Sequence, residues 1–196
     1  MVCFYWSQLL STAADSALDP VLLEVKLGNL SFPEIRSVHN YGKNASVRFI
    51  IENAGPQPHP MHVHGHNVFI LAEGACTRGP SASGGGPPAA TKRDAGESGN
   101  CWDGTIVNPT NPARRDVHML LPGQFIVIQW YQDNPGVWPL HCHIAWHLSS
   151  GFVWTVLEDA DTIQQDFSIP SVMAETCRGW AAFTGGAVVD QIDSGL

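Results

Sequence analysis

The sequence predicts an all-β fold, and two observations support this prediction. Short apolar runs rich in β-branched residues recur along the chain, at residues 47–52, 67–71, 124–131 and 152–158. Turn-forming residues bound these runs, as in Asn53-Ala-Gly-Pro56, Pro122-Gly123 and Asn134-Pro-Gly136. Several short strands separated by turns are typical of a Greek-key sandwich or barrel. No internal repeat is visible, so we expect a single β architecture.

Length and composition narrow the class of protein. The chain has 196 residues, of which 44% are hydrophobic, so we expect one domain spanning residues 1–196 with a core of its own. The net charge is −8, which argues against nucleic acid as a partner. No apolar run reaches the roughly 18 residues of a membrane span. Residues 1–16 have neither a basic start nor a clean apolar stretch, so no signal peptide is expected in this chain.

Two segments differ from the strand-rich part. Residues 74–104 contain Ser81-Ala-Ser-Gly-Gly-Gly-Pro-Pro88, which cannot build a core and predicts a mobile loop insertion. Cys76 and Cys101 flank this loop, and a disulfide between them would close its base, although sequence alone leaves the pairing open. Beyond about residue 160 the hydrophobic pattern weakens. We therefore expect a C-terminal extension over residues 160–196, with one or two short helices and an extended tail.

The main anomaly of the composition is its histidines. The chain has nine, and seven of them lie in two short segments. The first segment is His59-Pro-Met-His-Val-His-Gly-His66. Because side chains alternate along a strand, His62 and His64 should point the same way. Prolines on both sides of His59 stiffen the entrance of this strand, so His59 can point away from that pair.

The second segment, His141-Cys-His-Ile-Ala-Trp-His147, makes stronger use of the same alternation. His141 and His143 should share one face of a strand, with Cys142 on the other. His147 follows Cys142 by five residues and can return to the cysteine side after a turn. A thiolate on one face of a strand and two imidazoles on the other face can serve two metal sites joined by a covalent path.

Counting the ligands separates two sets. His59, Cys142 and His147 form the two-histidine, one-cysteine set of a blue-copper electron-transfer site. Four imidazoles without a thiolate remain, those of His62, His64, His141 and His143. One zinc ion takes about four ligands, so seven are too many for a single structural zinc site. Two separate zinc sites are the alternative, but they leave the His-Cys-His pattern unexplained.

The remaining candidate residues receive structural interpretations. We expect His66 to position a neighbouring ligand or strand rather than to bind metal. His39 and His118 are interpreted as ordinary surface or hydrogen-bonded histidines. Met61 and Met119 should fill the core, with soft ligation of copper as the alternative.

Both histidine segments resemble the third and fourth copper-binding motifs of multicopper oxidases. Further stretches resemble ascomycete laccases, namely Phe4-Tyr-Trp6, Asn111-Pro-Ala-Arg-Arg-Asp116, Asn134-Pro-Gly-Val-Trp138 and Asp193-Ser-Gly-Leu196. The resemblance therefore covers nearly the whole chain apart from residues 74–104. It implies a cupredoxin-like Greek-key β-sandwich that corresponds to the C-terminal, third domain of such an oxidase.

The resemblance also implies a role for each ligand. His59, Cys142 and His147 would hold the type 1 copper, which takes electrons from the substrate. His62 would bind type 2 copper, and the type 3 pair would be held by His64, His141 and His143. Phe152 stands at the axial position of the type 1 site, where a phenyl ring cannot ligate. Without an axial donor Cu(II) is less stabilised, so we expect a high redox potential.

The activity implied by the family is oxidation of phenolic, diphenol-type substrates coupled to four-electron reduction of oxygen to water. A complete enzyme of this kind carries four copper ions. The family places the other four histidines of the trinuclear cluster in two motifs near the N-terminus of a three-domain chain, and no His-Trp-His-Gly motif occurs here. We therefore expect the first and second domains to be absent, one type 1 copper in this chain alone, and no oxygen reduction by it.

Two alternative functions remain open. One is a single-copper electron-transfer or copper-binding module, and the other is an oxidase that couples phenols in secondary metabolism. The resemblance further implies secretion, with which the sequons at Asn29 and Asn44 agree. In the family, the cysteine that Cys177 resembles ties the third domain to the first, and the terminal Asp-Ser-Gly-Leu enters a channel. An unpaired buried thiol and a frayed terminus are the alternatives. The substrate should lie nearest His59 and His147, with Trp138 shaping its pocket.

Overall fold

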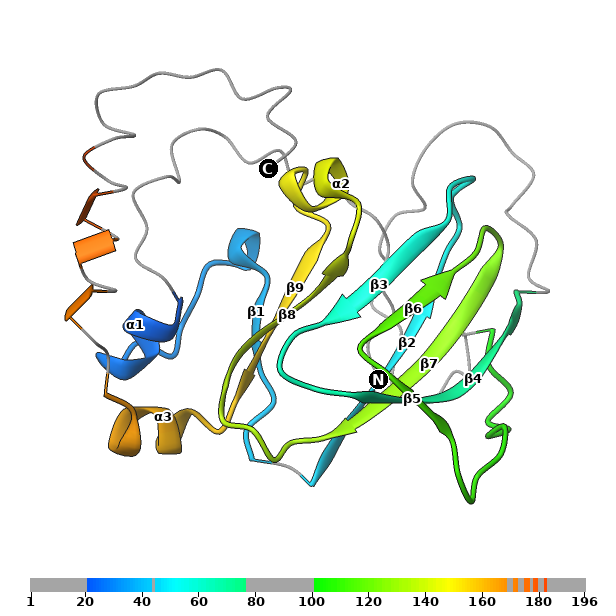
Figure 1. Cartoon of the computed structure of the whole chain (residues 1–196), viewed down its shortest axis with the longest axis horizontal. Helices are drawn as coiled ribbons and strands as arrows, with labels where there is room; N and C mark the ends of the chain where they lie inside the picture. The colour runs from blue at the N-terminus through cyan, green and yellow to red at the C-terminus, as the bar shows by residue number, and fades with distance from the viewer. Residues whose placement is uncertain are drawn as a thin grey trace.

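A computed structural model of the chain describes residues 21–43, 45–76 and 101–168, together with 171–172, 175–176, 178–179 and 182. Within these residues the strands, labelled in Figure 1, form two sheets that pack against each other. The five-stranded sheet has the order β1-β9-β8-β3-β6, and the four-stranded sheet has the order β2-β7-β4-β5. β1 and β9 run parallel, and every other pairing is antiparallel. The all-β, cupredoxin-like fold class expected from the sequence is confirmed.

The strand bounds agree well with the predicted runs. The strands are β1 Val38–Asn40, β2 Ser46–Glu52, β3 His59–Val63, β4 Val68–Ala75, β5 Ala113–Arg115, β6 Val117–Leu120, β7 Gln124–Tyr131, β8 Gly136–Cys142 and β9 Val153–Glu158. The prediction for β7 is confirmed at both ends. β1, β5 and β6 have no counterpart among the predicted runs because they are only three or four residues long and carry no clear alternation.

Short helices decorate the edges of the sheets. They are α1 Val21–Lys26, the 3-10 helix η2 Glu34–Arg36, α2 Ala145–Ser149 and α3 Ala160–Asp166. α3 lies inside the segment where the sequence predicted one or two short helices. It begins after Asp159, whose side chain accepts a hydrogen bond from the Thr162 backbone N–H. Among the described residues, no helix is long and apolar enough to cross a membrane.

Three hydrophobic clusters hold the elements together. The largest lies between the two sheets and includes Phe49, Ile128, Trp130 and Leu140, with Phe49 stacked on Trp130 at 5.1 Å between ring centroids. A second cluster lies behind β7, where Phe125 and Val127 face away from the first. β7 is thus buried on both faces, which explains why its sequence reads as a nearly continuous apolar run.

The third cluster joins the N-terminal and C-terminal parts of the described chain. Val25 of α1, Leu157 of β9 and Ile163 of α3 are its fully buried members. α1 and α3 therefore pack together beside the five-stranded sheet, as Figure 1 shows. The start of the predicted C-terminal extension is consequently part of the folded core. Burial of these apolar side chains supplies about 1.5–3 kcal/mol each.

The ends of the predicted 74–104 loop also belong to the fold. Gly74 and Ala75 complete β4, and Cys76 forms a disulfide with Cys101 across a Cα–Cα distance of 5.0 Å. The disulfide expected at the base of the loop is therefore present. Cys101 and Trp102 pack against the second cluster, because the disulfide ties them to the end of β4. Residues 77–100 lie outside the described residues, as do Cys3, the Phe4 motif, Asn44, Cys177 and the Asp193 tail.

The pairing of β3 with β8 positions the two histidine segments. His62 lies opposite His141, and Met61 lies opposite Cys142. Each strand alternates, so one face of this strand pair carries Met61 and Cys142 into the core and the other carries His62 and His141 outward. We call these the core side and the outer side of the β3–β8 pair.

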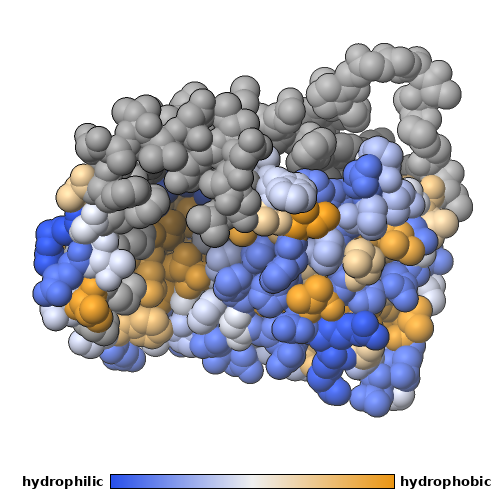
Figure 2. All heavy atoms as spheres, turned by 45° about the horizontal axis from the view of Figure 1, so that its top comes forward, coloured by the Kyte–Doolittle hydropathy of each residue, from blue (hydrophilic) through white to orange (hydrophobic). Residues whose placement is uncertain are grey.

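The described surface is mostly polar. In Figure 2, hydrophilic residues predominate over the visible described surface, and hydrophobic residues form separate patches. The exposed large hydrophobic residues are dispersed in the same way, with Leu27 in the N-terminal part, Val107 after the disulfide and Trp146 on α2. Single exposed apolar side chains are normal on a folded domain.

Candidate metal centre

On the core side, one cysteine and two histidines converge. The Cys142 sulfur lies 3.5 Å from Nδ1 of His59 and 3.3 Å from Nδ1 of His147. The three candidate ligand atoms all lie within 4.8 Å of one another. Cys142 is fully buried and is the only free cysteine among the described residues. The three residues that the sequence grouped together therefore lie together in space.

Local structure explains how these three residues meet. His59 is the first residue of β3, as expected for a histidine between two prolines, and Cys142 is the last residue of β8. The chain then turns through α2, which carries His147 back to the sulfur. The Phe152 N–H donates to the His147 carbonyl at 2.9 Å, and the Cys142 N–H donates to the Phe152 carbonyl at 3.3 Å. These two hydrogen bonds close the loop around the site.

Burial sets the protonation of the core-side set. It raises the pKa of the Cys142 thiol, because a thiolate would lose its hydration there. Burial, and then the neighbouring His147, lower the pKa of His59. The Phe152 ring packs edge-on against the His59 ring at 5.1 Å between centroids. Phe152 therefore contacts the site but offers it no donor atom.

A cavity of about 610 Å³ opens beside this set. His59, His147 and Phe152 line it, and much of its wall is apolar, from Met61, Leu120, Leu140 and Trp154. His39 also lines the cavity and stacks on Trp154 at 3.5 Å between ring centroids. Trp138 is not among the lining residues. The expectation that Trp138 shapes this pocket is therefore wrong, because its indole packs against Gly65 and Gly136, at the end of β8 away from Cys142.

On the outer side, four imidazoles gather. The ring centroid of His62 lies 4.8 Å from that of His64 and 5.5 Å from that of His141. Nε2 of His64 lies 3.0 Å from Nε2 of His141. His143 joins them at 5.6 Å from His62 and 5.8 Å from His141, again between ring centroids. The four histidines that the sequence separated from the cysteine thus form one cluster on the opposite face.

Backbone carbonyls orient two of these rings. Nδ1 of His62 donates to the Asp116 carbonyl at 2.8 Å, and Nδ1 of His141 donates to the Cys142 carbonyl at 2.9 Å. A ring whose Nδ1 carries the proton presents an unprotonated Nε2, the form that binds metal. Burial lowers the pKa of His141, and burial followed by the neighbouring histidines lowers that of His64. Both rings therefore favour the neutral form.

Both sets fit copper chemistry. A sulfur at about 2.3 Å and a nitrogen at about 2.0 Å from a metal in a trigonal plane are about 3.7 Å apart, a few tenths of an ångström above the observed separations of 3.5 and 3.3 Å. One thiolate with two imidazoles is the donor set of blue-copper sites. The compact outer group of His62, His64 and His141 offers only imidazole nitrogens. Imidazoles suit copper, zinc, iron and nickel, so the outer side alone is less selective.

The other singled-out residues take structural positions. His118 contacts the Glu73 carboxylate at 2.7 Å, and Met61 is buried in the largest cluster. Met119, in contrast, is 46% exposed, so the expectation that it fills the core is wrong. It follows Val117 and His118 on the short strand β6, at a position that faces solvent.

Two residues near the outer cluster, Glu158 and Asn134, received no specific role from the sequence. Glu158, at the end of β9, is fully buried and contacts both Asn134 and His66. It follows an apolar strand, and no local signal marks it. Asn134 was noted only as part of a family-like stretch, yet its side chain donates to the Gly65 carbonyl at 2.9 Å beside the outer cluster.

The two-sheet fold and these two groups of candidate ligands together define a class of protein domain. It is a cupredoxin-like domain of the kind found in copper oxidases. The solved laccase from Botrytis aclada matches it with a TM-score of 0.66 at 29% identity, over 90% of this chain and 30% of that chain. The family model for multicopper oxidases matches residues 8–162. The chain belongs to the multicopper oxidase family.

Curated relatives agree with this assignment. Laccase-2 of Podospora anserina is 33% identical over 184 residues, which cover 90% of this chain and 28% of that protein. The iron transport multicopper oxidase fetC of Epichloe festucae is 29% identical over 85% of this chain and 23% of its own length. The chain therefore spans less than a third of the length of the curated relatives it matches.

Proposed function

We propose that this chain supplies two parts of a laccase-type oxidase. The core-side set of His59, Cys142 and His147 would bind the type 1 copper and take electrons from a phenolic substrate. The outer-side set would contribute half of a trinuclear cluster, with His62 on type 2 copper and His64, His141 and His143 on the type 3 pair. Copper bound at these sites would supply one-electron redox chemistry that couples substrate oxidation to reduction of oxygen to water.

The observation that carries this proposal is the division of ligands between the two sides of the β3–β8 pair. Cys142 points into the core, while its sequence neighbours His141 and His143 belong to the outer cluster. A single peptide bond therefore links Cys142 to each of these two histidines. A short covalent path between an electron-accepting site and an oxygen-reducing site is what the proposed activity requires.

The cavity next to the core-side set suits a small aromatic substrate. A volume of about 610 Å³ lies within the usual range of small-molecule sites, and most of its walls are apolar. Nδ1 of both His59 and His147 faces the sulfur, so Nε2 is the ring nitrogen left to donate a hydrogen bond to a substrate hydroxyl. Phe152 packs against the His59 ring and adds an apolar surface to the same cavity.

The outer-side set has an open face that suits a further domain. His64 and His143 are exposed, whereas Cys142 and His141 are buried. We propose that two further domains, of the kind that the longer relatives contain, cover this face and bring the remaining histidines. Secretion is part of the same proposal, because the Cys76–Cys101 disulfide suits an oxidising compartment and Asn29 of the first sequon is exposed.

Copper loading of the purified full chain tests the proposal. One copper per chain with an intense thiolate-to-copper absorption band would support the core-side site. A second class of copper with an imidazole-type spin-resonance spectrum would support the outer cluster. A colourless protein that binds zinc as tightly as copper would contradict the assignment.

The competing function is a single-copper electron carrier. It is favoured by one observation, that His59, Cys142 and His147 come together within the described residues of this chain. Oxygen uptake with a diphenol separates the two. Uptake on addition of the missing histidine-bearing domains supports the oxidase, whereas reversible reduction without any uptake supports the carrier. Coupled phenol dimers as the product would point to the phenol-coupling alternative.

A further inference from the structure

The turn that follows β3 carries His64. The His64 ring is oriented differently from the rings of His62 and His141. His62 and His141 are each oriented by a carbonyl that accepts from the ring. Among the described residues, the His64 ring makes a polar contact only with Nε2 of His141, another ring of the cluster. The direction of the His64 side chain must therefore be set by its backbone, that is, by the turn 64–66.

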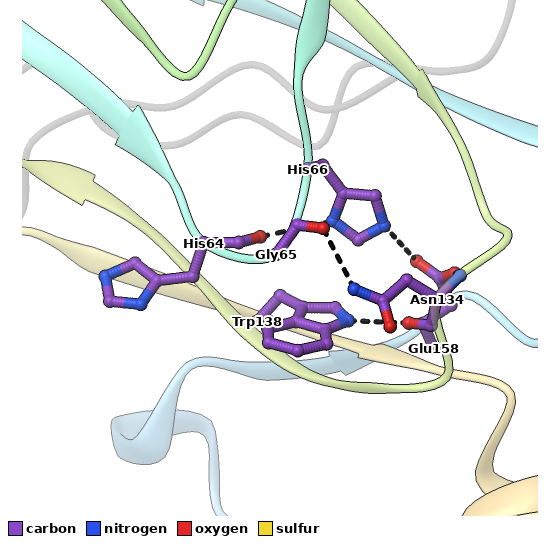
Figure 3. A network of polar contacts seen from close by, with 6 residues as sticks. All are labelled: His64, Gly65, His66, Asn134, Trp138 and Glu158. Carbon is purple, nitrogen blue, oxygen red and sulfur yellow. Dashed lines mark hydrogen bonds and ion pairs between the residues drawn. The ribbon is translucent and has the colours of Figure 1, made fainter.

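Several contacts fix the backbone of this turn. The His64 N–H donates to the Pro139 carbonyl at 2.9 Å. The Asn134 side chain donates from Nδ2 to the Gly65 carbonyl at 2.9 Å, as Figure 3 shows. Nδ1 of His66 donates to the His64 carbonyl at 3.1 Å. The backbone of the turn is therefore held by hydrogen bonds with Pro139 and Asn134, which lie outside the outer cluster, and with the ring of His66.

The Trp138 indole restricts which residue can occupy position 65 of the turn. Gly65 has φ +72°, and a Cβ added there would lie 2.6 Å from the Trp138 ring. A Cβ at Gly136 would lie 2.5 Å from the same indole. The Trp138 N–H donates to the Asn134 carbonyl at 2.7 Å, which holds the indole against both glycines. Only glycine satisfies both the positive φ and the close approach at position 65.

Beneath the turn lies a buried contact between a histidine and a carboxylate. Nε2 of His66 and the Glu158 carboxylate are 3.2 Å apart, with side chains only 4% and 1% exposed. The other Glu158 oxygen accepts from the Asn134 N–H at 2.8 Å. Both nitrogens of the His66 ring thus face acceptors, the His64 carbonyl and the Glu158 carboxylate, as Figure 3 shows. One carboxylate at the end of β9 therefore anchors both His66 and the residue that holds Gly65.

We propose that Glu158, His66 and Asn134 are positioning residues, which hold the turn 64–66 so that the His64 imidazole faces His141 in the outer cluster. This inference rests on the proposed function, because it assigns a purpose to the geometry of a proposed ligand. Groups that orient a metal ligand from outside contribute to metal affinity, and their loss usually lowers it about 10- to 100-fold.

Two substitutions test the proposal in the full chain. Asn134→Ser removes the hydrogen bond to Gly65 but keeps both backbone contacts of residue 134. Glu158→Gln keeps the shape of the carboxylate and removes its charge. His118→Gln is the matched control, because it breaks a histidine–carboxylate contact, with Glu73, outside this network.

The first readout needs no metal. In the copper-free chain, NMR should show a cross-relaxation signal between the His64 and His141 rings, which are in contact. We expect this signal to be lost or strongly weakened in both variants and kept in the control. Its persistence in Asn134→Ser and Glu158→Gln would overturn the proposal.

The second readout is copper affinity. In both variants we expect the imidazole-type spin-resonance signal to require about 10- to 100-fold more copper. The Cys142 thiolate-to-copper band should keep its wild-type intensity and copper affinity in both variants, which a general loss of structure would not allow. An equal loss of copper affinity at both sites, or a loss of copper affinity in His118→Gln, would also overturn the proposal. A wild-type chain without imidazole-bound copper would instead refute the proposed ligand assignment, and the NMR readout would still decide the positioning role.

Discussion

The core side and the outer side of the β3–β8 pair offer metals very different surroundings. The core-side set is complete within this chain, is enclosed by apolar side chains and has its thiol fully buried. The outer set consists of imidazoles alone, and His64 and His143 are exposed. One strand pair can thus carry an enclosed group with a thiol on one face and a group of imidazoles with exposed members on the other. The experiments below test whether the two are independent.

The largest effect is expected from Cys142→Ser. A hydroxyl cannot replace the thiolate as a soft donor, so the thiolate-to-copper absorption band should disappear completely. Copper bound by the outer imidazoles should remain visible by spin resonance, because those rings do not depend on the sulfur. Absorption and spin-resonance spectra of the same sample measure both. A band that survives the substitution would show that another residue supplies the coloured site.

The converse substitution, His141→Asn, should affect mainly the outer side. It removes a ring that contacts His64 and lies opposite His62. Loss of a ligand should lower copper affinity of the outer cluster by more than the roughly 10- to 100-fold expected for a supporting residue. The thiolate band should keep its intensity. His118→Asn is the control, and a parallel loss of the thiolate band in His141→Asn would contradict the independence of the two sides.

A smaller effect is expected from Phe152→Met. The thioether could approach the core-side set from the position of the phenyl ring and stabilise Cu(II) over Cu(I). The redox potential should fall by about 60 mV or more, the shift that a tenfold preference produces in a one-electron couple. Redox titration of the absorption band measures it. Phe152→Leu should change the potential less, and a Met variant with a higher potential than the wild type would refute the expectation.

The smallest effect is expected far from both sides, at Asp159. The hydrogen bond from Lys43, followed by those from Thr162, lowers the pKa of this carboxyl. Its stabilising contribution is therefore present above its unfolded pKa, near 4, and is lost as the pH falls through the lowered value. Lys43 is 72% exposed, so Asp159→Asn should cost less than about 1 kcal/mol at neutral pH.

Denaturant unfolding at several pH values checks this expectation. The difference in the free energy of unfolding between wild type and Asp159→Asn should shrink as the pH drops from about 5 to 3. Both copper signals should be unchanged at neutral pH. A difference that grows in acid would contradict the sign of the shift, and a change in either copper signal would show that the third cluster influences the strand pair.

Local patterns were enough to predict much of the fold and the spatial grouping of the candidate ligands. Strand β7 and the positions of His141, Cys142 and His143 follow from a two-residue period that is visible in the sequence itself. The return of His147 needed only a turn, which the structure builds as α2. Where the alternation is short or absent, as in β1 and β6, the sequence carried too little signal.

Contacts between distant segments were not predictable. Glu158 meets Asn134 across 24 positions, and Asn134 meets Gly65 across 69, and neither pairing leaves a local trace. The same limit explains the wrong role given to Trp138. The alternation places its indole on the core side, opposite Val156, but nothing local marks the turn at Gly65 that receives it.

The register of β3 against β8 has a consequence for how such a protein can change. His62 lies opposite His141 and Met61 opposite Cys142, so a slip by one residue would exchange the two faces of a strand. A single deletion or insertion inside either strand would therefore abolish both sites in one event. Point substitutions are the only changes that can adjust one site and spare the other. Surveys of length variants should accordingly find tolerance in the connections between strands and none within this pair.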